Sequence, residues 1–162
     1  MSPRQLVAIH AAHVERACVT WAQGPASDEP QLASMRPMLM ATCVDDEERL
    51  VERGMVSRRI RDRRQTAAEL GRTLALDGLE PLAVSQAFEG WIAPRTKAQS
   101  KLEVLVVSTT SGRDRRSVTT VREICRSVGG EAALGPLVIA DRPGRVGDLS
   151  LDVLNAFRQD AS

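Results

Sequence analysis

The chain has 162 residues, of which 43% are apolar. This is enough for one hydrophobic core and too little for two, so we expect a single domain over residues 1–162. The 22 Lys and Arg residues nearly balance the 21 Asp and Glu residues, and a net charge of +1 excludes a global field that would attract nucleic acid or anionic lipid. No run approaches the roughly 18 apolar residues of a membrane helix, and the N-terminus lacks a secretory signal pattern.

The cysteines and the aromatic residues further limit the class of protein and the functions to be expected. Cys18, Cys43 and Cys125 are odd in number, widely spaced and set among apolar residues, which favours reduced, buried thiols over a disulfide framework. The chain has no tyrosine, two tryptophans and two phenylalanines, so functions built on aromatic stacking are disfavoured. We expect a cytoplasmic protein with an aliphatic core and no membrane association.

The first expected element is an N-terminal helix. Ser2 suits its N-cap, Pro3 its first helical position, and Gln5 the second position of a capping box. Apolar residues then recur at helical spacing and form one face. These residues are Val7, Ala11, Val14, Cys18 and Trp21. We expect Gly24 and Pro25 to end the helix.

The next segments predict a strand, an ambiguous stretch and a long helix. Residues 38–44 form a short apolar run typical of a strand, and the acidic cluster Asp45–Glu48 follows it. Residues 50–56 either continue a helix that the acidic cluster begins or return as the second strand of a hairpin. A long central helix is expected to end at Asp77 and Gly78. Its apolar face consists of Val56, Ile60, Ala67, Leu70 and Leu74.

After Pro81 the apolar pattern changes to the period of a strand. Residues 82–92 alternate in polarity as a half-buried strand does. Residues 102–107 are apolar on both faces apart from Glu103, which predicts a central strand covered on each side. The segment 117–128 is ambiguous: its apolar spacing favours a helix, whereas its valine, threonine and isoleucine content favours an antiparallel strand. We favour the strand.

The chain is expected to end in a strand and a short helix. Residues 134–140 form the strand, and Asp148 or Ser150 caps the helix. The residues of this helix that are expected to face inward are Leu151, Leu154 and Phe157.

Four short motifs in the C-terminal half carry a family resemblance: VSQAFEGW at 84–91, EVLVV at 103–107, REI at 122–124 and LGPL at 134–137. In these motifs the chain resembles a group of uncharacterised bacterial proteins, in which a strand ends near a tryptophan and an apolar strand, a hairpin and an LGPL-like strand follow. The resemblance implies a β-hairpin over 102–128 within an antiparallel sheet. It implies no activity.

These elements predict an α+β fold. We expect an antiparallel sheet of about four to five strands, covered on one face by the N-terminal and central helices, with the short C-terminal helix packed at the end. The alternative is an α/β arrangement in which 117–128 is a helix and the loop STTSGR at 108–113 binds an anion at the N-terminus of that helix.

No set of residues predicts a catalytic site, a metal site or a bound cofactor. His10 and Cys18 lie roughly 12 Å apart along one helix, too far to share a zinc ion, and His13 is expected to be solvated. Both histidines lie on that helix, away from any nucleophile and acid that would complete a triad. The four acidic residues at 45–48 are interpreted as a solvated corner, because general acid catalysis needs one desolvated carboxyl group.

The arginines are the only concentrated charge. The ordinary interpretation is a solvated surface with local ion pairs; the functional one is a patch that contacts phosphate. They form two clusters, one of Arg58, Arg59, Arg61, Arg63 and Arg64 and the other of Arg113, Arg115 and Arg116. Our leading hypothesis is a non-enzymatic protein that acts through protein–protein contacts, including self-association as a homodimer. Nucleic-acid or phosphate binding through these arginines is the alternative.

Overall fold

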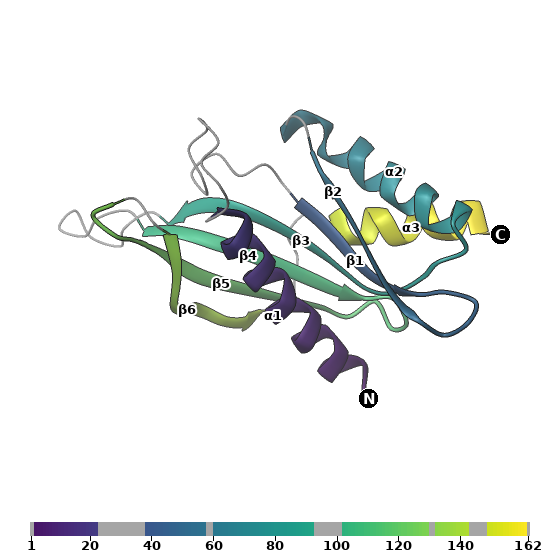
Figure 1. Cartoon of the computed structure of the whole chain (residues 1–162), viewed down its shortest axis with the longest axis horizontal. Helices are drawn as coiled ribbons and strands as arrows, with labels where there is room; N and C mark the ends of the chain where they lie inside the picture. The colour runs from purple at the N-terminus through teal and green to yellow at the C-terminus, as the bar shows by residue number, and fades with distance from the viewer. Residues whose placement is uncertain are drawn as a thin grey trace.

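The computed structural model describes residues 2–22, 38–57, 60–92, 102–129, 132–142 and 149–161. In chain order its elements are α1 (Pro3–Ala22), β1 (Met38–Val44), β2 (Leu50–Val56), α2 (Arg63–Leu76), β3 (Glu80–Ile92), β4 (Leu102–Ser111), β5 (Ser117–Arg126), β6 (Ala132–Arg142) and α3 (Leu149–Ala161). The strands form one antiparallel sheet in the order β2-β1-β3-β4-β5-β6 (Figure 1). The α+β class and the antiparallel sheet are confirmed, with six strands instead of four to five.

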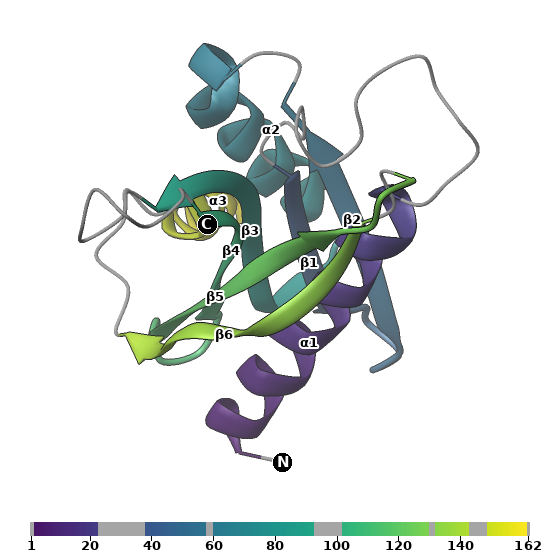
Figure 2. The ribbon, with the colours of Figure 1, turned by 90° about the vertical axis from the view of Figure 1, so that its left-hand side faces the viewer.

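The helices cover both faces of the sheet, which corrects the expected arrangement. α1 packs on one face, and α2 and α3 pack together on the other (Figure 2). The reason lies in strands that are apolar at successive positions. In β1, Leu39 joins the core under α2 and α3, whereas its neighbours Met38 and Met40 pack toward α1. A strand with two apolar faces needs cover on both sides.

α1 begins as predicted. The Ser2 N–H donates to Gln5 Oε1 at 2.9 Å, and the Gln5 N–H donates to Ser2 Oγ at 3.3 Å, which is the reciprocal capping box. Its predicted face is buried at Val7, Ala11, Val14 and Cys18. The Trp21 side chain and the expected stop at residues 24–25 lie outside the described residues.

Residues 50–56 form the second strand of a hairpin, so the helical alternative is wrong. β2 pairs with β1 in unbroken register from Met38↔Val56 to Val44↔Leu50. The turn is stabilised locally, because the Asp45 carboxylate accepts the N–H groups of Glu47 at 3.0 Å and Arg49 at 2.8 Å. These hydrogen bonds stabilise a turn at the residues where the alternative helix would have begun.

The central helix starts later than predicted. Val56 belongs to β2, a 3₁₀ turn spans Ile60–Asp62, and α2 begins at Arg63. Val56 was expected on the apolar face of this helix, but it pairs with β1 as part of β2 instead. The C-terminus is as predicted, with Asp77 at the C-cap and Gly78 at a φ of +67°.

The segment 117–126 is a strand, and the alternative α/β arrangement is wrong. β5 pairs with β4 from Val104↔Glu123 to Thr110↔Ser117, which is the hairpin that the family resemblance implies. Gly112 and the residues after it form a turn, in which the Arg115 N–H donates to Ser111 O at 3.0 Å. The loop therefore leads into a strand and offers no helix N-terminus to an anion.

The C-terminal strand and helix are both present. In α3 the most buried residues are Leu149, Ser150, Val153 and Leu154, while Phe157 is half-buried. Of the two expected caps, Asp148 lies outside the described residues, and Ser150 lies inside the helix, so the prediction of a Ser150 cap is wrong. No described helix is both long enough and apolar enough to cross a membrane.

Candidate interaction surface

Among the residues that the structure describes, β2 is an outer strand of the sheet and pairs only with β1. The Asp45 N–H donates to Arg49 O at 3.0 Å, so Asp45 and Arg49 form a hydrogen-bonded pair at the start of the hairpin. In an antiparallel ladder such pairs alternate with pairs whose main-chain groups point outward. The N–H and C=O groups that point away from β1 therefore belong to Leu50, Glu52, Gly54 and Val56.

The opposite edge of the sheet is built differently. The pairing of β6 with β5 shifts register between Thr119 and Val121, between Val121 and Arg122, and between Arg122 and Ile124. β6 also contains Pro136, which has no N–H to donate. Bulges, proline and charged side chains are devices that keep an edge from pairing; β2 has no bulge and no proline, and its charges are confined to Glu52 and Arg53. β2 is therefore the edge suited to receive another strand.

The side chains of β2 are apolar at its ends and charged at its centre. Leu50 is 70% exposed and Val56 is 49% exposed. On the face toward α1, Glu52 pairs with His13 Nε2 at 2.8 Å. On the face toward α2, Arg53 Nε lies 4.0 Å from Asp77. Each central charge is thus held by an ion pair on its own face of the sheet.

A groove lies beside the C-terminal end of β2. Its volume is about 460 Å³, and it opens between the strand and the first turns of α2. The strand contributes apolar atoms, and the helix contributes polar and acidic ones. Its lining comprises Met55, Val56, Asp62, Gln65, Thr66 and Glu69.

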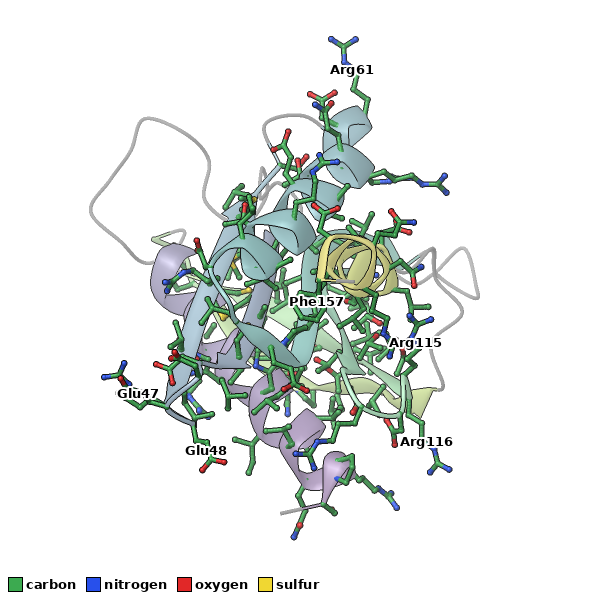
Figure 3. The ribbon with its side chains drawn as sticks, turned by 90° about the vertical axis from the view of Figure 1, so that its right-hand side faces the viewer. Glu47, Glu48, Arg61, Arg115, Arg116 and Phe157 are labelled. Atoms are coloured by element: carbon green, nitrogen blue, oxygen red, sulfur yellow. The ribbon has the colours of Figure 1, made fainter. Side chains whose placement is uncertain are left out.

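The two ends of β2 carry opposite charges. We call Asp45–Glu48 the acidic turn and residues 58–64 the arginine run. Glu47 and Glu48 are exposed at one end, and Arg61 lies at the other (Figure 3). The Arg49 N–H that hydrogen-bonds the Asp45 carboxylate lowers the pKa of Asp45, so Asp45 keeps its charge in mild acid.

The described members of the arginine run are exposed. Arg61, Arg63 and Arg64 project from the 3₁₀ turn and from the start of α2, and they make no ion pair with the part of the chain that the structure describes. Arg58 and Arg59 lie outside that part. The sequence predicted ion pairs between this run and acidic residues near it in the chain, and no such pair is found among the described residues. Two of those acidic residues pair elsewhere, Glu47 with Arg49 and Glu52 with His13.

The other three predicted arginines lie elsewhere, on the turn between β4 and β5. Figure 3 shows Arg115 and Arg116 well apart from Arg61. Arg115 is half-buried, and its Nη2 donates to Asn155 Oδ1 of α3 at 2.9 Å. Arg113 and Arg116 are exposed. The fold therefore does not bring the described members of the two arginine clusters together, and Arg115 links the turn to α3.

The two histidines of α1 have separate environments. His10 is buried, with Nε2 at 3.3 Å from Met40 O and Nδ1 at 2.7 Å from Thr42 Oγ1. Burial lowers the pKa of His10 to about 4, so the ring is neutral near pH 7. His13 instead pairs with Glu52. Among the described residues, no group of three potential ligands could hold a metal ion.

The cysteines differ from the expectation at one position. Cys18 and Cys43 are buried, and burial raises the pKa of each thiol to about 12. Cys125 is exposed, so the prediction that all three are buried is wrong there. It lies on the outer part of the sheet, where a Cβ at Gly135 would come within 2.8 Å of its sulfur. The neighbouring edge strand leaves that face of β5 open to solvent.

The sequence did not single out Leu50, Glu52 and Val56 as functional residues. Their role depends on β2 being an outer strand, which no local pattern encodes; the signal that was present is the apolar–charged–apolar order of residues 50–56. In comparisons with known proteins, no family model, curated protein or solved structure matches this chain.

Proposed function

We propose that the protein acts through protein–protein contacts at the free edge of β2, as a non-enzymatic cytoplasmic protein. A strand from a partner adds to the sheet there and accepts and donates main-chain hydrogen bonds. The observation that carries the proposal is the contrast between the two edges: β2 is regular and exposed, whereas β6 has register shifts and a proline. Strand addition is a common way in which an open sheet edge binds a protein.

The side chains around the edge support the same function. Leu50 and Val56 leave apolar surface in water that a partner strand would cover, and each contributes roughly 1 kcal/mol when buried. The groove beside Val56 gives the partner a place for a side chain. Main-chain bonds supply affinity in this mode, and such pockets supply specificity.

Binding of nucleic acid or of a phosphate ligand through the arginines is the alternative. It would gain from a single basic surface, and the described members of the two clusters lie apart. A titration of binding to a mixed-sequence duplex against salt separates the two functions, because phosphate contacts give a steep salt dependence. Tight, steeply salt-dependent binding would replace our proposal.

The test places charge on the edge. The double variant Leu50→Lys/Val56→Lys replaces two exposed apolar side chains with charged ones. This makes strand addition unfavourable, as lysines do on natural edges. We expect this variant to lose self-association measured by light scattering, or to lose proteins that the wild type retains in a pull-down. The matched control is Leu76→Lys, since Leu76 is 84% exposed but lies at the end of α2.

Two results would contradict the proposal. One is a wild-type protein that stays strictly monomeric at all concentrations and retains no protein partner. The other is an association that Leu76→Lys weakens as much as the edge variant does, because the effect would then follow from lost surface leucines in general.

A further inference from the structure

We infer that the partner at this edge is a second copy of the chain, whose β2 pairs antiparallel with β2 about a two-fold axis at Arg53. The inference rests on the proposed function and names its partner. The two sheets would join into one continuous sheet across the axis. Such an isologous contact uses the same surface on both copies and closes as a dimer.

The main-chain geometry selects this register. The outward-pointing groups of β2 belong to Leu50, Glu52, Gly54 and Val56. With the axis at Arg53, Leu50 lies opposite Val56 of the second copy and Glu52 lies opposite Gly54 of the second copy. Every outward N–H and C=O group of the strand then has a partner strand opposite it, and Arg53 Nη1, which donates to Glu52 O at 3.0 Å, must release that carbonyl. If the register shifts by two residues, one outward-pointing residue at an end of each β2 strand has no residue of the other β2 strand opposite it.

The side chains match in the same register. The order of β2 is apolar, apolar, charged, charged, glycine, apolar, apolar, which is nearly symmetric about Arg53. The exposed Leu50 and Val56 meet each other at both ends of the interface. Val51 lies opposite Met55 of the second copy on the face toward α2, where both already pack against the core. Apolar cross-strand pairs of this kind stabilise sheets.

The charges at the centre are partly compensated within each chain. Two copies of Arg53 meet at the axis, and each has Asp77 of its own chain at 4.0 Å. Glu52 has His13 at 2.8 Å and lies opposite Gly54 of the second copy, which carries no side chain. A shift of the axis to Glu52 would set two glutamates opposite each other instead of two arginines, so the central charges do not choose between these registers.

The charges at the ends of β2 complete the match. In an antiparallel pair, the acidic turn at the start of one β2 lies beside the arginine run at the end of the other. Asp46, Glu47 and Glu48 are exposed, as are Arg61, Arg63 and Arg64. The pairing therefore brings together two charged segments that lie at opposite ends of β2 in one copy (Figure 3). The contact occurs twice in the dimer because of the two-fold axis.

A disulfide at the axis tests the register. In a background with Cys125→Ser, Arg53→Cys places two thiols at a directly opposite, non-hydrogen-bonded pair, whose Cα separation of about 4.5 Å permits a disulfide. We expect mild oxidation to link this variant into a covalent dimer. The matched control is Met55→Cys on the same face, whose two copies would lie roughly 13 Å apart along the strands and should not link.

Charge reversal tests the ends of the interface. Glu47→Lys/Glu48→Lys should weaken the dimer, and Arg61→Glu/Arg64→Glu should weaken it similarly, by roughly tenfold in the dissociation constant because each change occurs at both ends. The chain that carries all four changes should recover most of the wild-type affinity. The matched control is Arg113→Glu/Arg116→Glu, which alters exposed arginines on the turn after β4. Sedimentation velocity measures all of these.

The outcomes separate this inference from the function on which it rests. The register is supported if Arg53→Cys forms a covalent dimer while Met55→Cys does not, and if the chain with all four charge reversals recovers the affinity of the dimer. A wild-type dimer that Leu50→Lys/Val56→Lys dissociates, but that Arg53→Cys does not link, would overturn the register and keep the edge. A monomer that retains another protein through the β2 edge would overturn the second copy as partner. Equal linking of Met55→Cys and Arg53→Cys would overturn the register as well.

Discussion

His10 links α1 to β1 while remaining uncharged. Its Nε2 lies 3.3 Å from Met40 O, and if Nε2–H is donated there, Nδ1 is free to accept from the Thr42 hydroxyl at 2.7 Å. Protonation of Nδ1 would replace that acceptor by a donor inside the core. Burial opposes the charged ring most strongly, and the hydrogen bond to Met40 and the charge of Glu52 compensate only in part.

The stability of the protein should therefore decrease in mild acid. The unfolded chain binds a proton on His10 near pH 6.5, whereas the folded chain does so only near pH 4. As the pH falls through this window, the free energy of unfolding should decrease by on the order of 3 kcal/mol. Urea unfolding across this range measures it. His10→Gln, whose amide can still donate to Met40 O, should show a shallower dependence, and equal slopes would contradict the assignment.

The three cysteines should react very differently. Cys125 is exposed, while Cys18 and Cys43 are buried with pKa values of about 12. Because the thiolate is the reactive form, a thiol-specific alkylating reagent should modify Cys125 alone in the native protein and all three after denaturation. Mass spectrometry of the labelled peptides gives the answer. Rapid native labelling of Cys18 or Cys43 would show that the core opens locally.

At the scale of elements, the closest approach is between α2 and α3. Gly71 of α2 faces Val153 and Phe157 of α3, and a Cβ at Gly71 would lie 2.3 Å from Val153 O and 2.8 Å from Phe157 N. These neighbours are main-chain atoms, which cannot move without moving the helix. Glycine at this position thus lets the two helices pack together over Leu70, Val153 and Leu154.

The variant Gly71→Ala should separate the two helices. In an open helix the change would favour folding by about 1 kcal/mol, but the clash should dominate and lower the free energy of unfolding by about 3 kcal/mol. Thermal or urea unfolding measures the loss. The control Gly129→Ala, where the nearest atom is 3.8 Å from the added Cβ, should leave stability within about 1 kcal/mol of the wild type. Similar losses in both variants would argue against the close crossing.

At the scale of the whole molecule, α1 is joined to the far half of the sheet by a polar contact. Glu15 is almost buried, and its carboxylate accepts hydrogen bonds from Thr120 Oγ1 at 2.8 Å and Arg122 Nε at 2.9 Å. These residues are 105 and 107 positions apart in the chain. The contact therefore fixes where α1 lies along the sheet, next to the apolar contacts of Val14 with Leu105 and Ile124.

Removal of the Glu15 carboxylate should loosen α1. Glu15→Ala leaves Arg122 and Thr120 without their acceptor and should lower the free energy of unfolding by about 2 kcal/mol, because the Arg122 side chain is 32% exposed and water replaces part of the interaction. Glu15→Gln keeps one acceptor oxygen and should lose less. Urea unfolding together with limited proteolysis of α1 checks both. Wild-type stability in Glu15→Ala would show that the apolar contacts suffice.

Local sequence patterns were sufficient to predict the features that residues close together in the chain determine. The capping box of Ser2 and Gln5, the stop at Gly78 and the alternation of β3 were all predictable, because adjacent residues supply the hydrogen bonds and the periodicity. The segment 50–56 was ambiguous because its sequence suits two structures. The pairing with β1 decided between them. The candidate surface was missed for a related reason, since an outer strand is defined by the absence of a neighbour.

The sequence by itself predicted a helix at each end and strands between them, and it favoured an α+β fold over an α/β one, since apolar spacing and turn residues act over a few positions. Only the tertiary structure decided that helices cover both faces, that β2 is a regular outer strand, that Cys125 is exposed and that the two arginine clusters lie apart. The physical reason is that strand order and burial depend on contacts between distant residues. Many such arrangements are compatible with the same local preferences.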